Sequence, residues 1–185
     1  GGSMSIKIGI NGFGRIGRCT LRAIYEQGLQ NEFDVVAINA AGDLKTNSHL
    51  LKYDTTHGRF RTSVETEGEN CIIIDGKKIA FYSTKNPKDI NWADHGVDIV
   101  LECTGAYTSK AKAQPLLEQG AKRVLISAPG GDDVDATIVY GVNEGILKAD
   151  MTVVSNASCT TNCLAPVAKI LSDSVGIKQG LMTTI

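Results

Sequence analysis

The chain has 185 residues and a formal net charge of −1, with 19 basic and 20 acidic side chains. This length suits one ordinary α/β domain with a sizeable core, and the balanced charge excludes a basic stripe for nucleic acid. No apolar run approaches the length of a membrane span and no secretory signal is recognised, so we expect neither nucleic-acid nor membrane partners. Residues 1–3, before Met4, are interpreted as a cloning remnant.

The first predicted element is a strand over residues 6–11 that runs directly into a G-x-G-x-x-G motif. The motif requires glycine at each position for a different reason: Gly12 allows a tight turn, Gly14 allows a pyrophosphate to approach the backbone closely, and Gly17 allows the helix to pack closely on the strand. A helix follows and ends at Gly28. Its apolar face is predicted at Ile16, Cys19, Ala23 and Ile24. With a second strand over residues 34–39, these elements form a βαβ unit, and we expect Asn11 and the glycines to bind a dinucleotide.

The end of the second predicted strand lacks the acid that often hydrogen-bonds the adenosine ribose in such sites, since Ala40 follows Asn39. Without a carboxylate there, a 2′-phosphate could be tolerated, and Lys45 is close enough in sequence to help. The alternative is that Asp43 or the Asn39 backbone serves the ribose. The cofactor is therefore expected to be NAD or NADP, with the choice between them left open.

Strands and helices then alternate, which is typical of a parallel sheet covered on both faces. An inserted hairpin is predicted, with strands 71–74 and 79–82 joined through Asp75-Gly76. Later strands are predicted at 99–103, 123–127 and 137–140, and a helix at 110–119. Ligands bind outside the carboxyl ends of parallel strands, so Thr104, Gly105 and Ser127 are expected to face the cofactor. The fold class is therefore α/β, a Rossmann-type doubly wound, mostly parallel sheet with an inserted hairpin.

The last predicted strand, 151–154, leads into a helix, and Cys159 falls in or beside its first turn. Unpaired backbone N–H groups and the positive end of the helix dipole favour a thiolate there, which is the nucleophilic form. The hydroxyls of Ser158 and Thr160 could cap the helix or hold an anionic group. The alternative is a buried structural cysteine. Five cysteines without framework spacing favour a reducing compartment, hence a cytoplasmic location, and the cysteines and histidines give no convincing metal site.

These motifs together resemble the amino-terminal portion of the phosphorylating glyceraldehyde-3-phosphate dehydrogenases. The resemblance covers residues 6–185, and its marks are the segments 10–18, 52–58, 102–105, 127–129 and 158–163. It implies that Cys159 attacks the aldehyde and gives a hemithioacetal, that a hydride passes to NAD(P), and that inorganic phosphate cleaves the thioester, a step of glycolysis. It also implies that Ser158 and Thr160 hold phosphate, that the backbone at Arg15 and Ile16 cradles the pyrophosphate, and that the full-length protein is a homotetramer.

The same resemblance divides the chain into a dinucleotide-binding domain, residues 1–157, and the start of a truncated α+β catalytic domain, residues 158–185. The family's catalytic histidine would lie beyond Ile185, so the 185-residue chain is expected to be nearly inactive on its own. Two alternatives stay open: an erythrose-4-phosphate dehydrogenase, which shares the glycine turn and the cysteine motif, and a nucleotide-binding fragment without catalysis.

Overall fold

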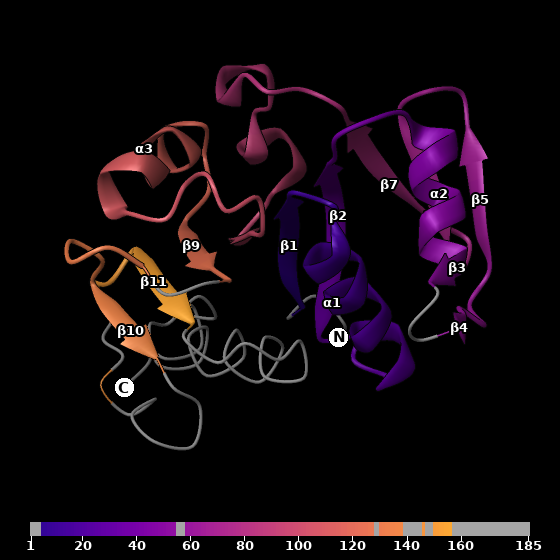
Figure 1. The fold of residues 1–185 in the computed structure, drawn as a ribbon, viewed down its shortest axis with the longest axis horizontal. Coiled ribbons are helices and arrows are strands. Elements are labelled where there is room, and N and C mark those ends of the chain that lie inside the picture. The colour runs from indigo at the N-terminus through magenta and orange to yellow at the C-terminus, as the bar shows by residue number, and fades with distance from the viewer. Residues whose placement is uncertain (1–4, 55–57, 128–129, 139–145, 147–149, 157–185) are drawn as a thin grey trace.

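The computed structural model describes residues 5–54, 58–127, 130–138, 146 and 150–156. Its main feature is a nine-stranded sheet formed within these residues (Figure 1). In spatial order the strands are β10 (Ala136–Ile138), β11 (Val153–Asn156), β9 (Arg123–Ile126), β8 (Ile99–Glu102), β1 (Ile6–Asn11), β2 (Phe33–Asn39), β7 (Lys77–Tyr82), β6 (Cys71–Ile74) and β5 (Val64–Glu67). Every neighbouring pair from β10 to β7 is parallel, whereas β7–β6 and β6–β5 are antiparallel. The predicted doubly wound, mostly parallel fold is confirmed.

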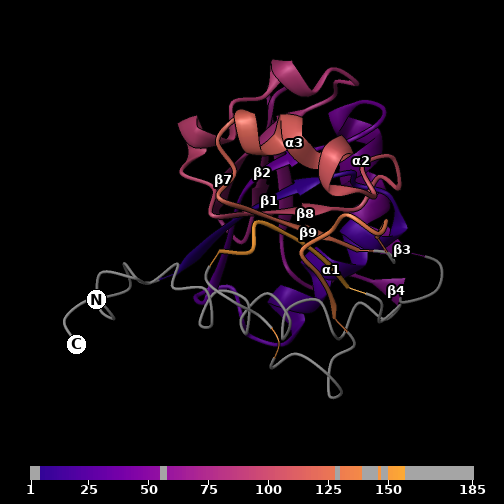
Figure 2. The same cartoon turned by 90° about the vertical axis from the view of Figure 1, so that its left-hand side faces the viewer.

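The helices cover both faces of the sheet and bury two separate apolar clusters. The α-helices of the described residues are α1 (Arg15–Glu26), α2 (Leu44–Lys52) and α3 (Lys110–Glu118), and the 3₁₀ helices η2 (Pro87–Asp89) and η3 (Trp92–His95) lie between β7 and β8. Helices α1 and α2 pack on one face, while α3 and η3 pack on the other. Figure 2 shows α1 and α3 on opposite sides of the central strands. A short antiparallel pair, β3 (Tyr53–Asp54) and β4 (Gly58–Arg59), follows α2.

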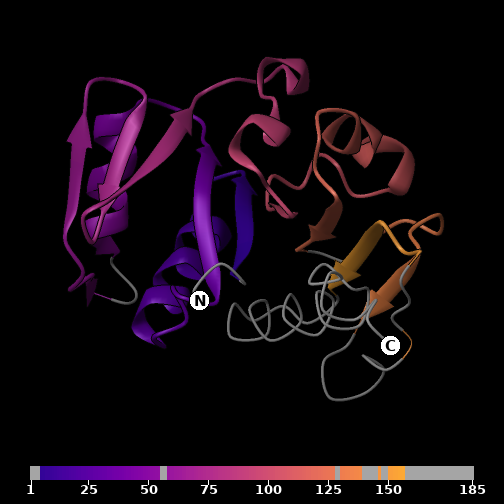
Figure 3. The same ribbon diagram turned by 180° about the vertical axis from the view of Figure 1, so that it is seen from behind.

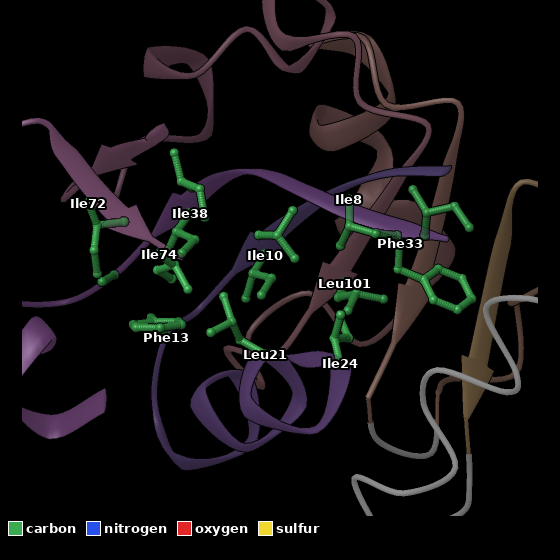
Figure 4. Packing of buried hydrophobic residues seen from close by; sticks show 14 of the residues in the cluster. Ile8, Ile10, Phe13, Leu21, Ile24, Phe33, Ile38, Ile72, Ile74 and Leu101 are labelled. Atoms are coloured by element: carbon green, nitrogen blue, oxygen red, sulfur yellow. The ribbon is translucent and has the colours of Figure 1, made fainter. Parts of the chain in front are cut away.

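The central strands are apolar on both sides because both faces are covered, as expected of parallel strands. In β1, Ile8 and Ile10 point to the α1 face, where Figure 4 shows them above Leu21 and Ile24 of α1. Gly9 points the opposite way, and a Cβ built on it would lie 2.6 Å from the Trp92 ring. The glycine therefore makes room for the largest buried side chain of the second face.

The predicted apolar face of α1 is wrong at its first position. Ile16 is 40% exposed, whereas Leu21 is fully buried and Ile24 is 2% exposed. The buried stripe passes through Gly17, Leu21 and Ile24, at the i, i+4, i+7 spacing of one helix face. Gly17 starts this stripe because the helix lies too close to the glycine turn for a larger residue there.

The predicted hairpin is confirmed, and its return strand has a second role. Asp75 and Gly76 both have positive φ, 53° and 78°, which is the requirement of a two-residue type I′ turn. Strand β7 also pairs in parallel with β2, so it is the third strand of the dinucleotide-binding half. Strand β5 was not predicted; Figure 3 shows it at the hairpin end of the sheet, opposite β10 and β11.

The carboxyl-terminal part of the described chain is tied together by aspartates. Asp133 accepts hydrogen bonds from the backbone N–H groups of Lys110 (2.9 Å) and Ala111 (3.0 Å), so it caps α3. Asp135 pairs with the Lys110 ammonium at 2.5 Å and accepts from the N–H groups of Thr152 (2.8 Å) and Val153 (3.0 Å). The ladder begins at Val153, one of the residues whose amide Asp135 holds, so β11 spans 153–156 and not the predicted 151–154.

Candidate nucleotide-binding site

A cleft of 760 Å³ opens at the carboxyl ends of β1, β2, β7 and β8. Strand β1 lies between β2 and β8, so this edge is the point where the order of strands reverses, the usual ligand site of an open α/β sheet. Five short segments and seven single residues form its wall. They are residues 11–14, Arg18, 39–42, Asn47, Leu50, 83–85, Pro87, Ile90, Trp92, 103–104, 106–107 and Leu116.

The glycine turn between β1 and α1 has the geometry of a phosphate cradle. Gly12 has φ +100°, and a Cβ on it would lie 2.7 Å from the Thr104 backbone nitrogen. A Cβ on Gly17 would lie 2.3 Å from the Gly12 carbonyl oxygen, so neither position admits a side chain without movement. Above Gly14, by contrast, nothing lies within 4 Å of an added Cβ. The open space at the N-terminus of α1 fits a pyrophosphate. The phosphate oxygens would accept hydrogen bonds from the first-turn amides and would be stabilised by the positive end of the helix dipole.

A buried carboxylate underlies this turn. Glu102, the last residue of β8, is 1% exposed and accepts a hydrogen bond from Asn11 Nδ2 at 2.6 Å. It also accepts from the Thr104 backbone N–H at 2.8 Å and the Thr104 hydroxyl at 2.5 Å. Burial raises the pKa of the Glu102 carboxyl, against the opposite effect of the hydrogen bonds from Thr104 and Asn11. The carboxylate thus connects the ends of β1 and β8.

The hydrogen bonds continue from Asn11 to the end of β2 and beyond. Asn39 Nδ2 donates to Asn11 Oδ1 at 2.9 Å and to the Thr84 carbonyl at 3.0 Å, while Asn39 Oδ1 accepts from the Thr84 N–H at 3.0 Å. The Asn39 side-chain amide therefore uses both its nitrogen and its oxygen in hydrogen bonds within the protein. Within the described residues it holds the segment after β7 against the end of β2.

The described wall of the cleft carries cations and no carboxylate, since Glu102 lies beneath it. The cationic side chains are Arg18, which also donates to the Phe13 carbonyl at 3.2 Å, and Lys85. Ala40 is 4% exposed and leaves the end of β2 without a charge. This balance suits a ligand with phosphate groups.

Two residues considered for the ribose lie away from this wall. Asp43 caps α2 by accepting from the Thr46 N–H at 2.7 Å, and this hydrogen bond lowers the pKa of its carboxyl. Lys45 lies in the first turn of α2 and does not line the cleft. The lysine brought to the wall is Lys85, from the segment after β7.

The structure divides the predicted site residues into three groups. Those in the wall of the cleft are Asn11, Gly12, Gly14, Asn39, Ala40 and Thr104. Those near the wall but outside it are Arg15, Ile16, Gly17, Gly105 and Ser127. Ser127 is held at the end of β8, where both its N–H (3.0 Å) and its hydroxyl (2.9 Å) donate to the Glu102 carbonyl. Ser158, Cys159 and Thr160 lie outside the described residues.

One wall of the cleft was missed by the sequence analysis. It is formed from the segment 83–92, by residues 83–85, Pro87, Ile90 and Trp92, together with Tyr107 and with Leu116 of α3. The available signal was the carboxyl end of the strand that became β7: once that strand is placed beside β2, the residues after it must reach the same edge.

Among the described residues, the remaining titratable groups form no second centre. His49 stacks against Tyr53, and His95 shares a 2.6 Å hydrogen bond with the Tyr82 hydroxyl; neither histidine lines the cleft. Cys103 does line it, but burial raises the pKa of its thiol to about 12, so it stays protonated. In the part of the chain that the structure describes, no cluster of His, Cys, Asp or Glu could hold a metal, and no helix is long and apolar enough to cross a membrane.

Comparison with known proteins gives the family of each part. Residues 6–110 match the model of the glyceraldehyde 3-phosphate dehydrogenase NAD binding domain, and residues 158–185 match that of the same family's C-terminal domain. A plasmid-encoded glyceraldehyde-3-phosphate dehydrogenase of Cupriavidus necator is 56% identical over 98% of this chain and 54% of its own length. The Pseudomonas aeruginosa enzyme is 54% identical over the same shares, and that of Streptomyces coelicolor is 53% identical over 98% of this chain and 53% of its own length. The chain thus spans about half the length of the curated relatives it matches.

Proposed function

Because the chain belongs to the glyceraldehyde 3-phosphate dehydrogenase family and carries its NAD-binding domain, we propose that it is the cofactor-binding part of an enzyme that oxidises and phosphorylates glyceraldehyde 3-phosphate. The observation that carries this proposal is the cleft at the switch point of the sheet, with open space above Gly14 and cationic side chains in its wall. In this role Asn11, Gly12, Gly14, Ala40 and the other predicted site residues at the strand ends bind NAD or NADP. The cofactor, when bound, supplies the hydride acceptor.

The chemistry at the reacting carbon is assigned to Cys159. Its thiolate attacks the aldehyde carbon and forms a hemithioacetal; loss of a hydride from that carbon and of the proton from its hydroxyl gives a thioester. Inorganic phosphate then attacks the thioester carbonyl, and the Cys159 sulfur leaves as 1,3-bisphosphoglycerate is released. Ser158 and Thr160 are proposed to hold the phosphate group. The enzyme would act in glycolysis.

The direct test is NAD(P)H formation by the 185-residue chain supplied with NAD⁺ or NADP⁺, glyceraldehyde 3-phosphate and phosphate. Turnover is expected to be low, because neither described histidine, His49 or His95, lines the cleft. The substitution Cys159→Ser should abolish what remains, whereas Cys71→Ser should not. Turnover that is independent of both inorganic phosphate and Cys159 would overturn the proposal.

Cofactor choice is proposed to extend to both NAD and NADP. Ala40 leaves no carboxylate at the end of β2, and Lys85 brings a cation to the same cleft. Calorimetric titration with each dinucleotide tests this directly. A preference for NAD⁺ of tenfold or more, about 1.4 kcal/mol, would exclude dual use.

Two alternatives remain testable. An erythrose-4-phosphate dehydrogenase would show the higher kcat/KM with the four-carbon aldehyde, and the names of the relatives favour the three-carbon substrate. A purely nucleotide-binding fragment would bind cofactor but show no cofactor-protected, fast-reacting thiol at Cys159.

We also propose the remaining organisation from the family. The dinucleotide-binding domain ends at residue 157 and the catalytic domain starts at 158, which is supported by the start of the second family match at that residue. The full-length protein is proposed to be a homotetramer, testable by light scattering. A cytoplasmic location is proposed as well, supported by the absence of a disulfide at the three described cysteines, Cys19, Cys71 and Cys103.

A further inference from the structure

Glu102 is a deeply buried acidic side chain that lies directly beneath the wall of the cleft and is not part of that wall. Its carboxylate receives hydrogen bonds from three donors: Asn11 Nδ2, the Thr104 N–H and the Thr104 hydroxyl, at 2.6, 2.8 and 2.5 Å. An ionised carboxylate only accepts hydrogen bonds, so this set of donors matches the charged form. In the described part of the chain no cation pairs with it, and the charge is held by neutral donors alone.

The carboxylate also fixes the direction of the hydrogen bonds beyond it. Because Asn11 Nδ2 donates to Glu102, Asn11 Oδ1 must face Asn39 and accept from its Nδ2. Asn39 Oδ1 is then left to accept from the Thr84 N–H. The chain of bonds runs from β8 through β1 and β2 to residue 84, and a reversed Asn11 amide would break it at two places.

All the groups that Glu102 holds are in the wall of the cleft, namely Asn11, Asn39, Thr84 and Thr104. Thr104 also packs closely on the glycine turn, since its backbone nitrogen lies 2.7 Å from the position that a Cβ of Gly12 would take. One buried carboxylate is therefore connected to the side chains of Asn11 and Asn39 at two strand ends, to the backbone of Thr84, and to Thr104 in the loop that faces the turn.

We propose that Glu102 is a positioning residue for the cofactor: its ionised carboxylate holds Thr104 and the Asn11–Asn39–Thr84 chain in the arrangement that receives the dinucleotide. This inference rests on the proposed function of the cleft and assigns Glu102 no contact with the cofactor itself. Protonation of the carboxylate would place an O–H group among hydrogen-bond donors and would remove one acceptor. The hydrogen bonds to Thr104 and to the Asn11–Asn39–Thr84 chain would both weaken.

Cofactor affinity should then depend on pH with a sign opposite to that of stability. Burial raises the pKa of the Glu102 carboxyl in the folded chain, so ionisation costs folding free energy, and its contribution to stability declines as pH rises through that pKa. Affinity instead needs the ionised form and should rise over the same range. The side-chain carboxylate of Glu102 is contacted by Asn11 at the end of β1 and by Thr104 in the following loop, while Ser127, just after β9, contacts its main-chain carbonyl; none of these groups titrates. Its chain neighbour Cys103 stays protonated, since its pKa is about 12.

The test compares Glu102→Gln with a matched control, Glu65→Gln, which changes an exposed carboxylate on edge strand β5. Calorimetry with NAD⁺ should give at least a tenfold higher Kd for Glu102→Gln at about pH 8, and an unchanged Kd for the control. The wild-type Kd should rise as pH falls through the raised pKa of Glu102, while that of Glu102→Gln stays flat. A purely structural role would lower the urea midpoint without removing this pH dependence.

Each outcome decides the inference. If Glu102→Gln folds and binds NAD⁺ with the wild-type Kd and the wild-type pH profile, the inference is overturned while the proposed function stands. If Glu102→Gln does not fold, the wild-type pH profile and Thr104→Val decide: a flat profile together with unchanged binding by Thr104→Val refutes the role. If the wild-type chain binds neither NAD⁺ nor NADP⁺, the proposed function fails, and the inference fails with it.

Discussion

Alanine substitutions at two neighbouring glycines should separate folding from cofactor binding. Gly14→Ala places a methyl group where nothing lies within 4 Å, at φ −77°, which alanine readily adopts. Its effect on unfolding free energy should stay within about 1 kcal/mol. Gly12→Ala places the methyl 2.7 Å from the Thr104 nitrogen at φ +100°. Backbone strain and overpacking together should cost about 2 to 6 kcal/mol.

Binding should rank the two variants differently from stability. In Gly14→Ala the methyl group occupies the space that a pyrophosphate needs, so the Kd for NAD⁺ should rise at least tenfold, about 1.4 kcal/mol, in a chain as stable as the wild type. Urea unfolding without cofactor and calorimetric titration measure the two quantities on the same samples. Wild-type affinity in a folded Gly14→Ala chain would refute the assignment of this turn as the phosphate cradle. A Gly12→Ala chain as stable as the wild type would refute the close contact with Thr104.

Three further outcomes follow from burial and charge. Leu21→Ala should lower the unfolding free energy by about 2 to 5 kcal/mol, whereas Ile16→Ala, at a site 40% exposed, should change it by about 0.5 kcal/mol; equal urea midpoints would contradict the packing of α1. The pKa of Asp135 is lowered overall: burial raises it, but hydrogen bonds from a lysine and two backbone amides lower it by more. The contribution of Asp135 to stability is therefore present above its unfolded pKa and is lost as pH falls through its folded pKa. Asp135→Asn should therefore flatten the acid-unfolding curve, and an unchanged curve would count against the contact. Cys103, with a pKa of about 12, should be alkylated at pH 8 roughly 10³-fold more slowly than free cysteine under the same conditions, as peptide mapping by mass spectrometry would show.

The cofactor half of the fold was predictable because its signals are local. The glycines at 12, 14 and 17 follow a strand and open a helix, and the Asp75-Gly76 turn fixes its hairpin, so sequence spacing determines the geometry. The exposed Ile16 was mispredicted because helical spacing alone does not say which of two adjacent apolar stripes faces the sheet. That choice depends on how closely Gly17 lets α1 approach the turn.

The features that escaped prediction depend on contacts between distant residues. Residues 83–92 reach the cleft only because β7 pairs with β2, and no local sequence pattern predicts that pairing. The start of β11 is set by an aspartate about 18 positions earlier in the chain, through its hydrogen bond to the Val153 amide. Glu102 reads as an ordinary strand residue, and only its three converging donors single it out.

The central claim is that the cleft at the ends of β1, β2, β7 and β8 binds a dinucleotide. The most direct measurement is a titration of the isotope-labelled chain with NAD⁺, followed by backbone amide chemical shifts. The account predicts saturable changes concentrated at Gly14, Asn39, Thr84 and Thr104, with the β5–β6 edge unaffected. Saturable changes confined to that edge, or none at any cofactor concentration, would contradict it.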